Sequence, residues 1–545
     1  MSSMKVEEYI QSLNRLPLSE INRRIEQVSG ISDFFGDSSE IRSSLHEARK
    51  DGYEYGDWQT NLGLADKVTR LVKASYSPQV LIEPTCGKGN FVLAALDTFD
   101  TLTDIYAIEI FKPYLQQLKY GILQGYLDGK YKRKISFHLM HCNVFDVDWG
   151  TIKSNINGKN LLIMGNPPWV TNSNLGRVDS TNLPKKTNIK QVSGLSAMTG
   201  KGNFDIAEYI CYQLIQNFTE KGTRIALLLK NSVIRQICGS VPNMHLHIKN
   251  MSQYCIDAKK EFGASVDASL FLCEAGDGET ICDVCDFYTK QSLYQYGWVN
   301  GKFVSDIQGY RNTEYLDGLS PINWRSGIKH DCQSVLELEK RGDTYVNKLG
   351  EEVWVEDEYI YPYVKSSDIQ QANFEKDHVR YVIVPQKKIG ENTESLQYTA
   401  PLTYNYLLQH KGFFDRRKSS IYKKQSPFSI FGIGSYTFMP YKIVISSLYK
   451  SPRFVLVSPI NGKCVIPDDT CYLVGFEKYE DAQYVYSLLA DTPVSNFIQS
   501  VSFHDAKRII TKDLLMRINL RKVSSQRVQT LKNFSYSPQQ ELLFE

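Results

Sequence analysis

The sequence contains neither a long apolar run nor a strong excess of one charge. No stretch approaches the roughly 20 consecutive apolar residues that a transmembrane helix requires, and residues 1–16 lack the apolar core of a signal peptide. We therefore expect a cytoplasmic protein with no membrane partner. Lys and Arg number 63 against 60 Asp and Glu, a net charge of +3, so overall charge does not indicate a nucleic-acid-binding protein. Any such argument must rest on local clusters.

The cysteines give no sign of a disulfide framework or a metal site. Their number, 11, is odd and they are scattered along the chain, which favours reduced thiols. Cys282 and Cys285 form a single Cys-x-x-Cys pair with no second Cys or His pair nearby, whereas a structural zinc ion needs four ligands. An (Asp/Glu)-x-Lys sequence is also missing close to Pro467-Asp468, the nearest being at 505–507. We therefore expect no metal and no fused nuclease.

Residues 60–272 alternate short apolar stretches with longer helical ones. The stretches VLIEP, IYAIEI, LLIMG and RIALLLK have the length and composition of strands. This alternation predicts a parallel sheet covered by helices on both faces. After a turn-like sequence near residue 280 the composition shifts toward Tyr, Ser and short β-prone runs. We expect an N-terminal helical segment over 1–50, an α/β domain over 51–280 and a mixed α/β domain over 281–545.

A glycine-containing turn follows the first predicted strand. Residues 80–91, VLIEPTCGKGNF, run through Gly87 and Gly89 into a predicted helix, and glycines there let backbone amides approach a ligand closely. The segment lacks the spacing of a P-loop, and Val92 stands where a dinucleotide-binding motif has its third glycine. Glu109 ends the next strand about 20 residues later, where an acidic residue can bind a ribose diol. A structural turn and a cofactor other than a dinucleotide both remain open.

The most informative segment is Asn166-Pro167-Pro168-Trp169, directly after the apolar stretch 161–165. Two prolines cannot continue a strand ladder, so the chain must leave the sheet in an extended form. The Asn166 amide oxygen and the Pro167 carbonyl would then be fixed acceptors, with Trp169 as a partly exposed aromatic plane beside them. Hydrogen bonds to these oxygens from both N–H groups of an exocyclic amine would localise the nitrogen lone pair for attack on a methyl sulfonium. A simple strand-ending turn is the alternative.

The polar segment 170–203 that follows is expected to be a functional loop or an insertion.

Together these segments resemble a known enzyme family. Glu-Pro-x-x-Gly-x-Gly-x-Phe at 83–91, followed by Asn-Pro-Pro-Trp at 166–169, is similar to the amino-methyltransferases that modify N6 of adenine in DNA. The order, with a Thr-bearing segment at 57–60 in front, resembles the subgroup called gamma. The resemblance covers residues 50–275 by motif and extends more loosely to about 520. It implies a Rossmann-like S-adenosylmethionine-dependent methyltransferase domain, a C-terminal mixed α/β target-recognition domain, and S-adenosyl-L-methionine as the cofactor, with no metal.

The resemblance also implies roles for individual residues. Thr60 would touch the methionine carboxylate of the cofactor, Glu83 to Gly87 would line its amino-acid part, and Glu109 would bind the ribose. The expected cofactor-binding residues are Thr60, Glu83, Pro84, Thr85, Cys86, Gly87, Glu109, Asn143, Asp146 and Asn166. Asn143 stands where the family usually has Asp to read the adenine ring, and Asp146 is the alternative reader.

The expected catalytic residues are Asn166, Pro167, Pro168 and Trp169. Phe262 lies in the segment 261–271, which resembles a late strand of the family, and would oppose Trp169. A base inside a duplex cannot reach such a pocket, so the target adenine would have to be flipped out and stacked between the two rings.

One basic segment in the C-terminal half suits contacts with DNA phosphates. Residues 411–424, KGFFDRRKSSIYKK, interleave basic side chains with hydroxyls, and a solvated charged loop is the alternative. The candidate DNA-binding residues are Arg416, Arg417, Lys418, Lys423 and Lys424. Three further stretches, 324–331, 365–368 and 467–472, look similar to parts of target-recognition domains, without assigning base contacts.

We therefore expect an adenine-specific DNA methyltransferase that acts on duplex DNA as the modification enzyme of a restriction-modification system, where a cognate restriction endonuclease would be a further partner. Two alternatives remain open. One is a methyltransferase that acts on RNA or on a protein glutamine, against which the mass of chain after Leu272 argues. The other is a DNA-binding specificity subunit without activity, against which the intact 166–169 segment argues.

Overall fold

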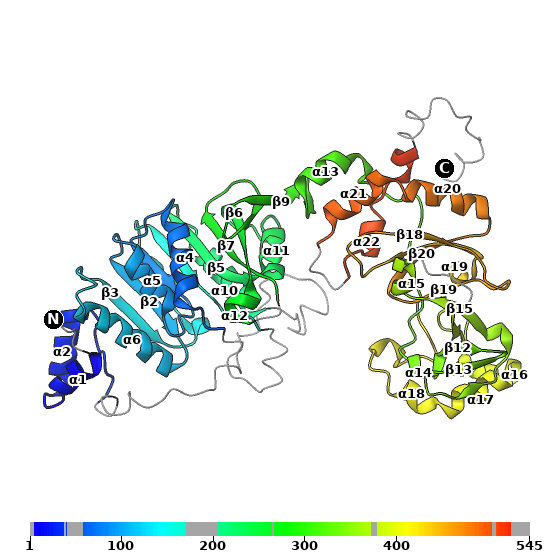
Figure 1. Cartoon of the computed structure of the whole chain (residues 1–545), viewed down its shortest axis with the longest axis horizontal. Helices are drawn as coiled ribbons and strands as arrows, with labels where there is room; N and C mark the ends of the chain where they lie inside the picture. The colour runs from blue at the N-terminus through cyan, green and yellow to red at the C-terminus, as the bar shows by residue number, and fades with distance from the viewer. Residues whose placement is uncertain are drawn as a thin grey trace. The chain divides into compact units, whose positions relative to one another are not determined.

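A computed structural model of the chain (Figure 1) divides into two units, unit 1 over Met1–Phe303 and unit 2 over Val304–Glu545. The structure describes residues 5–37, 40, 58–170, 205–263, 266–371, 379–503 and 508–524. Asp57, nearly all of the polar segment 170–203, and residues 505–507 lie outside the described residues. None of the described helices combines the length and the apolar character needed to span a bilayer.

Unit 1 is built on a sheet of ten described strands in the order β10-β9-β8-β6-β7-β5-β4-β1-β2-β3. Their bounds are β1 (Val80–Glu83), β2 (Asp104–Glu109), β3 (Ser136–His141), β4 (Leu161–Gly165), β5 (Thr223–Lys230), β6 (Ile248–Ile256), β7 (Ala268–Ala275), β8 (Ile281–Asp286), β9 (Ser292–Val299) and β10 (Lys302–Val304). Strands β3, β2, β1, β4 and β5 are parallel, and β7 runs antiparallel to β5. The order reverses between β1 and β4, and the carboxyl ends beside such a reversal are where open α/β sheets bind ligands.

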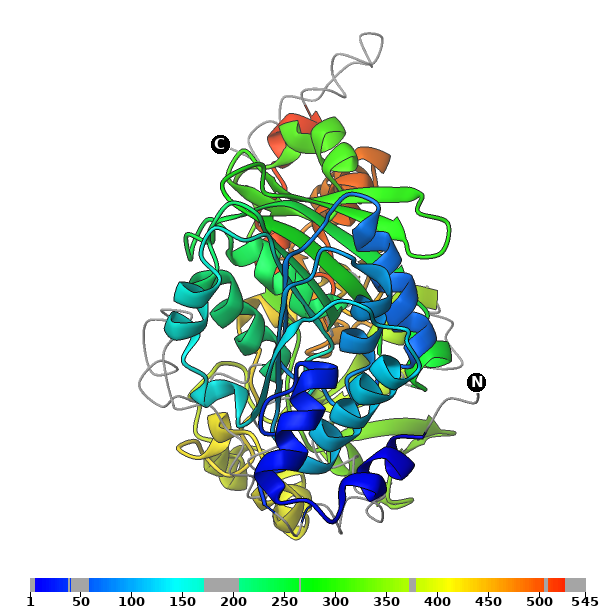
Figure 2. The same cartoon turned by 90° about the vertical axis from the view of Figure 1, so that its left-hand side faces the viewer.

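Helices cover both faces of this sheet, which is why β1 and β4 are buried along their whole length and read as continuous apolar runs. Figure 2 shows two groups of helices on opposite sides of the strands. One group is α4 (Leu62–Lys73), α5 (Asn90–Thr98) and α6 (Lys112–Leu127), and the other is α7 (Trp149–Asn155), α10 (Ile206–Asn217) and α11 (Asn231–Ser240). The predicted Rossmann-like α/β fold is therefore confirmed.

The N-terminal residues pack against this sheet rather than standing alone. Helices α1 (Val6–Leu13) and α2 (Leu18–Ser29) contact α6. The backbone N–H of Val6 donates to Gln124 Oε1 over 2.9 Å, and Ile31 forms a parallel bridge with Phe137 of β3. The N-terminal helices therefore cover the outer edge of the sheet at β3.

Unit 1 continues past residue 280, where the sequence suggested a domain edge. β8 pairs in parallel with β6 and antiparallel with β9, so both strands extend the same sheet. The turn-like sequence near residue 280 connects β7 to β8 within this sheet. The boundary lies at residue 303, because β8 and β9 pair into the sheet of unit 1.

Unit 2 is a mixed α/β unit with two sheets, as the sequence predicted. The sheet orders among the described strands are β11-β20-β17-β18 and β14-β13-β12-β16-β15-β19. The strands are β11 (Arg325–Ser326), β12 (Glu337–Arg341), β13 (Thr344–Asn347), β14 (Glu352–Val353), β15 (Ile360–Val364), β16 (Arg380–Ile383), β17 (Tyr441–Ser446), β18 (Phe454–Val457), β19 (Ile466–Pro467) and β20 (Cys471–Phe476).

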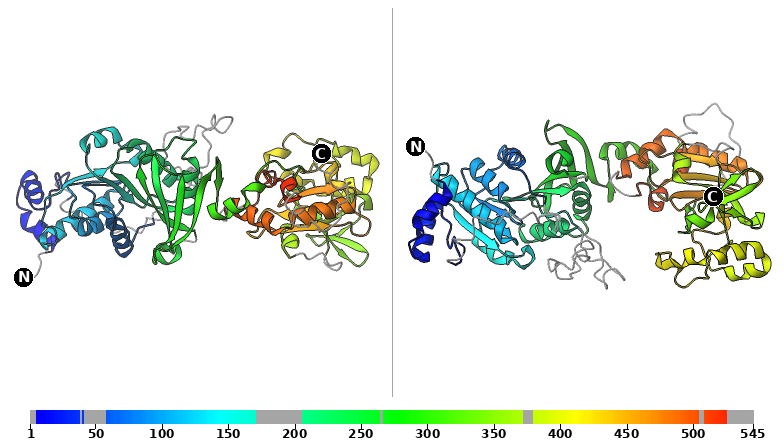
Figure 3. Two further views of the ribbon diagram at one scale, coloured as in Figure 1. Left: turned by 90° about the horizontal axis from the view of Figure 1, so that it is seen from above. Right: turned by 60° about the horizontal axis from the view of Figure 1, so that its bottom comes forward.

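The helices of unit 2 form separate groups. Within the unit, Figure 3 shows α16 to α18 in yellow, away from α20 and α21 in orange. The helices are α13 (Ile307–Thr313), α14 (Gln333–Leu336), α15 (Ser366–Gln371), α16 (Leu396–Thr399), α17 (Pro401–Gln409), α18 (Lys411–Asp415), α19 (Ser435–Phe438), α20 (Tyr479–Leu489), α21 (Thr492–Val501) and α22 (Lys512–Leu515).

The three stretches singled out in the C-terminal half meet at one place in unit 2. The Ile328 N–H donates to the Pro467 carbonyl over 2.9 Å, and the Ser366 hydroxyl donates to the Thr470 carbonyl over 2.9 Å. At Gly327 the backbones approach so closely that an added Cβ would lie 2.2 Å from the Asp468 carbonyl oxygen. These contacts, one of them between residues 104 positions apart in sequence, therefore hold the two sheets together.

Gly327→Ala is expected to destabilise unit 2, because its Cβ would displace backbone that cannot rotate away. We expect a loss of about 1–3 kcal/mol, the usual cost of forcing extra volume into a packed site. Gly412→Ala is the control, because its Cβ would meet nothing within 4 Å. Urea unfolding of both variants measures the difference, and equal stabilities would contradict the role given to Gly327.

Candidate active site

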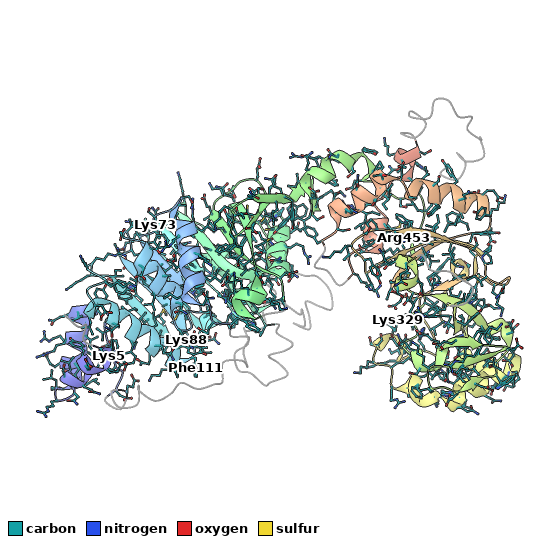
Figure 4. All side chains as sticks on the ribbon, viewed as in Figure 1. Lys5, Lys73, Lys88, Phe111, Lys329 and Arg453 are labelled. Atoms are coloured by element: carbon teal, nitrogen blue, oxygen red, sulfur yellow. The ribbon has the colours of Figure 1, made fainter. Side chains whose placement is uncertain are left out.

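The turn after β1 is shaped by two glycines in left-handed backbone conformations. Gly87 has φ +51° and Gly89 has φ +80°. A Cβ on Gly89 would lie 2.3 Å from Leu118 Cδ1 of α6, and one on Gly87 would lie 2.6 Å from Gln59 Oε1. Both positions therefore require glycine. Gly89 leaves room for Leu118 of α6, and Gly87 leaves room for Gln59, which crosses the turn. Figure 4 shows Lys88, in this turn, at the same edge of unit 1 as Phe111, which follows β2.

Glu109 fixes the relation between this turn and the end of β2. Its Oε2 accepts the Gly87 N–H over 2.7 Å, and its Oε1 accepts the Phe111 N–H over 2.8 Å. The side chain is 8% exposed. The carboxylate is thus buried and held in one orientation at the carboxyl edge of the sheet, where the sequence placed it.

Four buried polar atoms at this edge have no hydrogen-bond partner among the described residues. They are Thr60 Oγ1, Glu83 Oε2, Thr85 Oγ1 and Asn166 Oδ1. Native proteins rarely leave buried polar atoms unpaired, so a cluster of them indicates a place for a polar ligand. The residues come from three segments that contact one another: the Asn90 amide donates to the Thr60 carbonyl, and Asn166 donates to the Trp58 carbonyl. The expected set around Thr60, Glu83–Gly87 and Asn166 is therefore brought together.

Glu83 is the electrostatic exception in this cluster. It is 2% exposed, and burial raises the pKa of its carboxyl well above the ordinary value, with the nearby Glu109 carboxylate raising it further. The Val92 backbone N–H opposes this shift. An ammonium group bound beside Glu83 would favour its ionised form, so the donor set suits a cationic, amino-acid-like ligand.

The side chain of Asn166 is held by one end only. Its Nδ2 donates to the Trp58 carbonyl over 2.8 Å, which leaves Oδ1 as the unpaired acceptor at the end of β4. β4 ends at Gly165, and a Cβ there would meet Glu83 Cγ at 3.3 Å. The amide oxygen of Asn166 and the carboxyl of Glu83 therefore belong to one site.

Trp169 is buried, so the expectation of a partly exposed aromatic plane was wrong. The residue is 5% exposed, and its indole N–H donates to the Leu228 carbonyl of β5 over 3.2 Å. Phe262 is its ring neighbour as expected, at 5.2 Å between centroids, but the rings meet edge to face at 72°. A base stacked between them needs roughly 7 Å, two contacts of about 3.5 Å, so the rings must separate to admit one. Phe262 is half-buried at the end of α12 (Ala258–Phe262).

Asn143 and Asp146, the two residues after β3 that were expected to contact the adenine ring of the cofactor, differ in exposure. Asn143 is half-buried and its Oδ1 accepts the Phe145 N–H over 3.0 Å, which starts a short 3₁₀ turn (Val144–Asp146). Asp146 is exposed.

Sequence reasoning missed Ile110 and Phe111, which directly follow Glu109 and are 47% and 41% exposed. The signal was an apolar pair next to the acidic residue that ends β2.

Arg417 is half-buried and its guanidinium is bonded within unit 2, which corrects its assignment to DNA binding. Its guanidinium donates to the carbonyls of Phe414, Pro427 and Ser429 and stacks over the Tyr422 ring at 3.7 Å. Those bonds tie segments of unit 2 together. The other candidates, Arg416, Lys418, Lys423 and Lys424, are exposed.

The described residues hold no group of three or more His, Cys, Asp or Glu side chains that could bind a metal ion. No known family model matches the sequence. The chain is 40% identical over 480 residues to the type II methyltransferase M.NspV of Nostoc sp., an alignment that covers 87% of this chain and 98% of that protein. Because 480 residues exceed the length of unit 1, the similarity extends into unit 2.

Among solved structures, the type IIL restriction-modification enzyme MmeI, in complex with DNA, aligns with 90% of this chain and 74% of its own, at 12% identity and a TM-score of 0.48. The type IIG restriction endonuclease BpuSI aligns with 89% of this chain and 63% of its own, at 15% identity and a TM-score of 0.34.

The strand order of unit 1, with β7 antiparallel beside β5, and the polar edge at β1, β2 and β4 define a Rossmann-like fold of the S-adenosylmethionine-dependent methyltransferase class. The identity with M.NspV places the protein more narrowly. The chain belongs to the type II methyltransferases of restriction-modification systems.

Glu83→Gln is expected to stabilise the ligand-free protein while weakening cofactor binding. A carboxyl whose pKa is raised on folding contributes stability below the ordinary carboxyl pKa of about 4.3, and that contribution is lost as the pH rises toward the folded-state pKa. The uncharged Gln avoids this loss, so its advantage should grow from pH 4 to pH 8, by about 1–3 kcal/mol, the cost of an unsatisfied buried group.

Thermal unfolding across this pH range measures the effect, with the exposed Glu26→Gln as control. An advantage that does not change with pH would contradict the burial of an ionised Glu83. Cofactor affinity, measured by calorimetry at pH 8, should fall in Glu83→Gln and stay unchanged in the control.

Proposed function

We propose that the protein transfers a methyl group from S-adenosyl-L-methionine to N6 of an adenine flipped out of duplex DNA, as a gamma-type modification enzyme. The unpaired Oδ1 of Asn166 at the carboxyl end of β4 carries this proposal. It is a buried hydrogen-bond acceptor in a site whose neighbours suit an amino-acid-like cofactor.

The residues at the β1 and β2 edge would hold the cofactor. Glu83, Thr60 and Thr85 offer unpaired atoms to its amino-acid part, and Glu109 stands where the ribose hydroxyls would lie. Exposed Ile110 and Phe111 offer an apolar surface for the adenine ring. When bound, S-adenosylmethionine supplies a methyl group on a positively charged sulfur.

Asn166 and Pro167 would prepare the target amine. The bond from Nδ2 to the Trp58 carbonyl fixes the amide so that Oδ1 faces the site as an acceptor. One N–H of the adenine amine would donate to Oδ1 and the other to the Pro167 carbonyl, which localises the nitrogen lone pair. The nitrogen held by these two acceptors would take the methyl group, whose bonding pair would stay with the sulfur, and would then release one proton to solvent. Asn166 would also lie beside the cofactor, because the residue before it, Gly165, packs against Glu83.

Trp169 and Phe262 would stack on the two faces of the flipped base. Their rings touch, and a base that separates them gains two stacking contacts of about 1–3 kcal/mol each, which offsets part of the cost of leaving the duplex. Arg416, Lys418, Lys423 and Lys424 remain candidates for phosphate contacts. The similarity to M.NspV along both units favours this function over the modification of RNA or of a protein glutamine, and a cognate endonuclease would be the second partner of such a system.

Asn166→Ala is expected to lower methyl transfer by about 10²–10³-fold or more, since a preorganised group is lost from the transition state. Cofactor affinity should stay near that of the wild type. The measurements are transfer of tritium from labelled cofactor to duplex DNA, and cofactor binding by calorimetry. Asn217→Ala, at the far end of α10, is the matched control. A large loss of cofactor binding in Asn166→Ala would instead place this side chain mainly in the cofactor site.

Phe262→Ala is expected to weaken capture of the target base, whereas Phe262→Tyr should preserve it. Loss of one stacking contact corresponds to roughly a 5- to 150-fold weaker interaction. Fluorescence of 2-aminopurine at the target position reports the extrahelical base. Equal enhancement in the Ala and Tyr variants would argue against stacking on Phe262.

A further inference from the structure

The carboxyl end of β5 carries an ion pair that the proposed reaction does not use. Lys230, the last residue of β5, places its Nζ 2.6 Å from Asp205 Oδ2. The two side chains are 19% and 9% exposed. Asp205 also caps α10, because its Oδ1 accepts the Ala207 N–H over 3.1 Å. A pair this buried is costly to break and holds its two elements in a definite geometry.

This pair completes a closed ring of contacts around Trp169. The indole N–H of Trp169 donates to the Leu228 carbonyl on β5, two residues before Lys230. The carbonyl of Val170, the next residue after Trp169, accepts the N–H of Ile206 in the first turn of α10. Strand β5 and helix α10 are thus each bonded to the tryptophan segment, and the ion pair joins the strand to the helix.

The segment that carries Phe262, the ring neighbour of Trp169, is connected to the carboxyl end of β5 from the opposite side, through β7. Lys230 pairs with Ala268 of β7, and the Asn231 N–H donates to the Asp267 carbonyl. The Ser269 hydroxyl donates to Asn231 Oδ1 over 2.7 Å. Because β7 follows α12, which ends at Phe262, the end of β5 lies between the segments that carry Trp169 and Phe262.

We propose that the Asp205–Lys230 ion pair is a positioning element that holds Trp169 in the orientation needed to receive the target base. It touches neither base nor cofactor in this arrangement, and acts by fixing β5 and α10 on the two sides of the tryptophan. The proposal rests on the function proposed above, because it assigns Trp169 to the target base. Misplacement of a substrate-positioning group by about 1 Å lowers rates by roughly 100-fold.

The test combines a readout of the ring with a readout of the reaction. Lys230→Met, Asp205→Asn and the double variant Lys230→Met/Asp205→Asn are prepared with 5-fluorotryptophan, and the Trp169 fluorine line is assigned by its loss in Trp169→Phe. Both single variants should shift or broaden this line without DNA, and should lower kcat/KM for DNA by roughly 10- to 100-fold with cofactor affinity unchanged. Lys230→Arg should restore both signals.

The double variant keeps the test decisive. It removes both charges without leaving one buried alone, so it should fold even if Lys230→Met does not, and it should perform no worse than the poorer single variant. Lys153→Met, which breaks the exposed Lys153–Glu220 pair, is the matched control and should change neither readout.

An unchanged Trp169 line together with unchanged kcat/KM would overturn the proposal, and so would independent, multiplying losses in the double variant. The fluorine signal requires no methyl transfer. If the wild type modified no adenine in DNA while the Trp169 line still responded to Lys230→Met, the proposed function would fail and the positioning role would stand.

Discussion

The carboxylate of Glu109 ties the two strand ends on which the rest of the site depends. By accepting the backbone N–H groups of Gly87 and Phe111, it fixes the turn after β1 against the end of β2. The turn can adopt this path because Gly87 and Gly89 occupy left-handed conformations, and because Gly89 leaves room for Leu118. The parallel strand order then brings Asn166 to the same edge through β4. One buried hydrogen-bonded carboxylate thus joins two of the three segments at this edge, and the pairing of β1 with β4 adds the third.

The site holds several buried polar atoms without a partner among the described residues, and Glu337 of unit 2 shows how cations can compensate a carboxylate buried to the same depth. Glu337 is as buried as Glu83, at 3% against 2% exposed. Burial alone would raise the pKa of Glu337, yet hydrogen bonds from His330, Lys348 and Lys365 lower it to about 2. Among the described residues no cation lowers the pKa of Glu83, and the carboxylate of Glu109 raises that pKa further. The same side chain at the same depth is therefore a structural anchor in unit 2 and an unsatisfied group in unit 1. Departures of this kind concentrate where a ligand completes the structure.

The sequence was sufficient to predict the alternating strands and helices of unit 1, because parallel strands buried on both faces must be continuous apolar runs. The family resemblance implied that Thr60, Glu83, Glu109 and Asn166 share one site, and the parallel sheet brings the last three to one edge because each ends or follows a strand there. Sequence reasoning failed where the outcome depends on distant partners. Trp169 is buried because the Leu228 carbonyl, 59 residues away, takes its indole N–H. The domain edge was misplaced because a turn between two strands has the same composition as a linker.

The expectation for Arg417 in the basic segment of unit 2 failed for a related reason. Arg417 lies among charged neighbours in the sequence, yet the carbonyls of Pro427 and Ser429 take its donors. Local composition indicates which side chains are charged, but not which carbonyls of other segments face them. The number of charged residues in such a run is therefore only an upper limit on the cations available to a partner, and Arg417 lowers it by one because its guanidinium is bonded within unit 2.

Asn143 stands where the family that the sequence resembles usually has Asp, and the structure shows what holds its side chain. Its amide oxygen is committed to the Phe145 N–H, so it starts the turn after β3 as a backbone cap would. A side chain fixed in this way contributes less as an acceptor for the amino group of a bound adenine than an Asp carboxylate, which has two oxygens, would contribute. Exposed Ile110 and Phe111 lie directly after Glu109, where a purine ring attached to a Glu109-bound ribose would fall. In the cofactor site proposed above, that ring would therefore be held more by apolar contact than by Asn143, and exposed Asp146 is the other candidate.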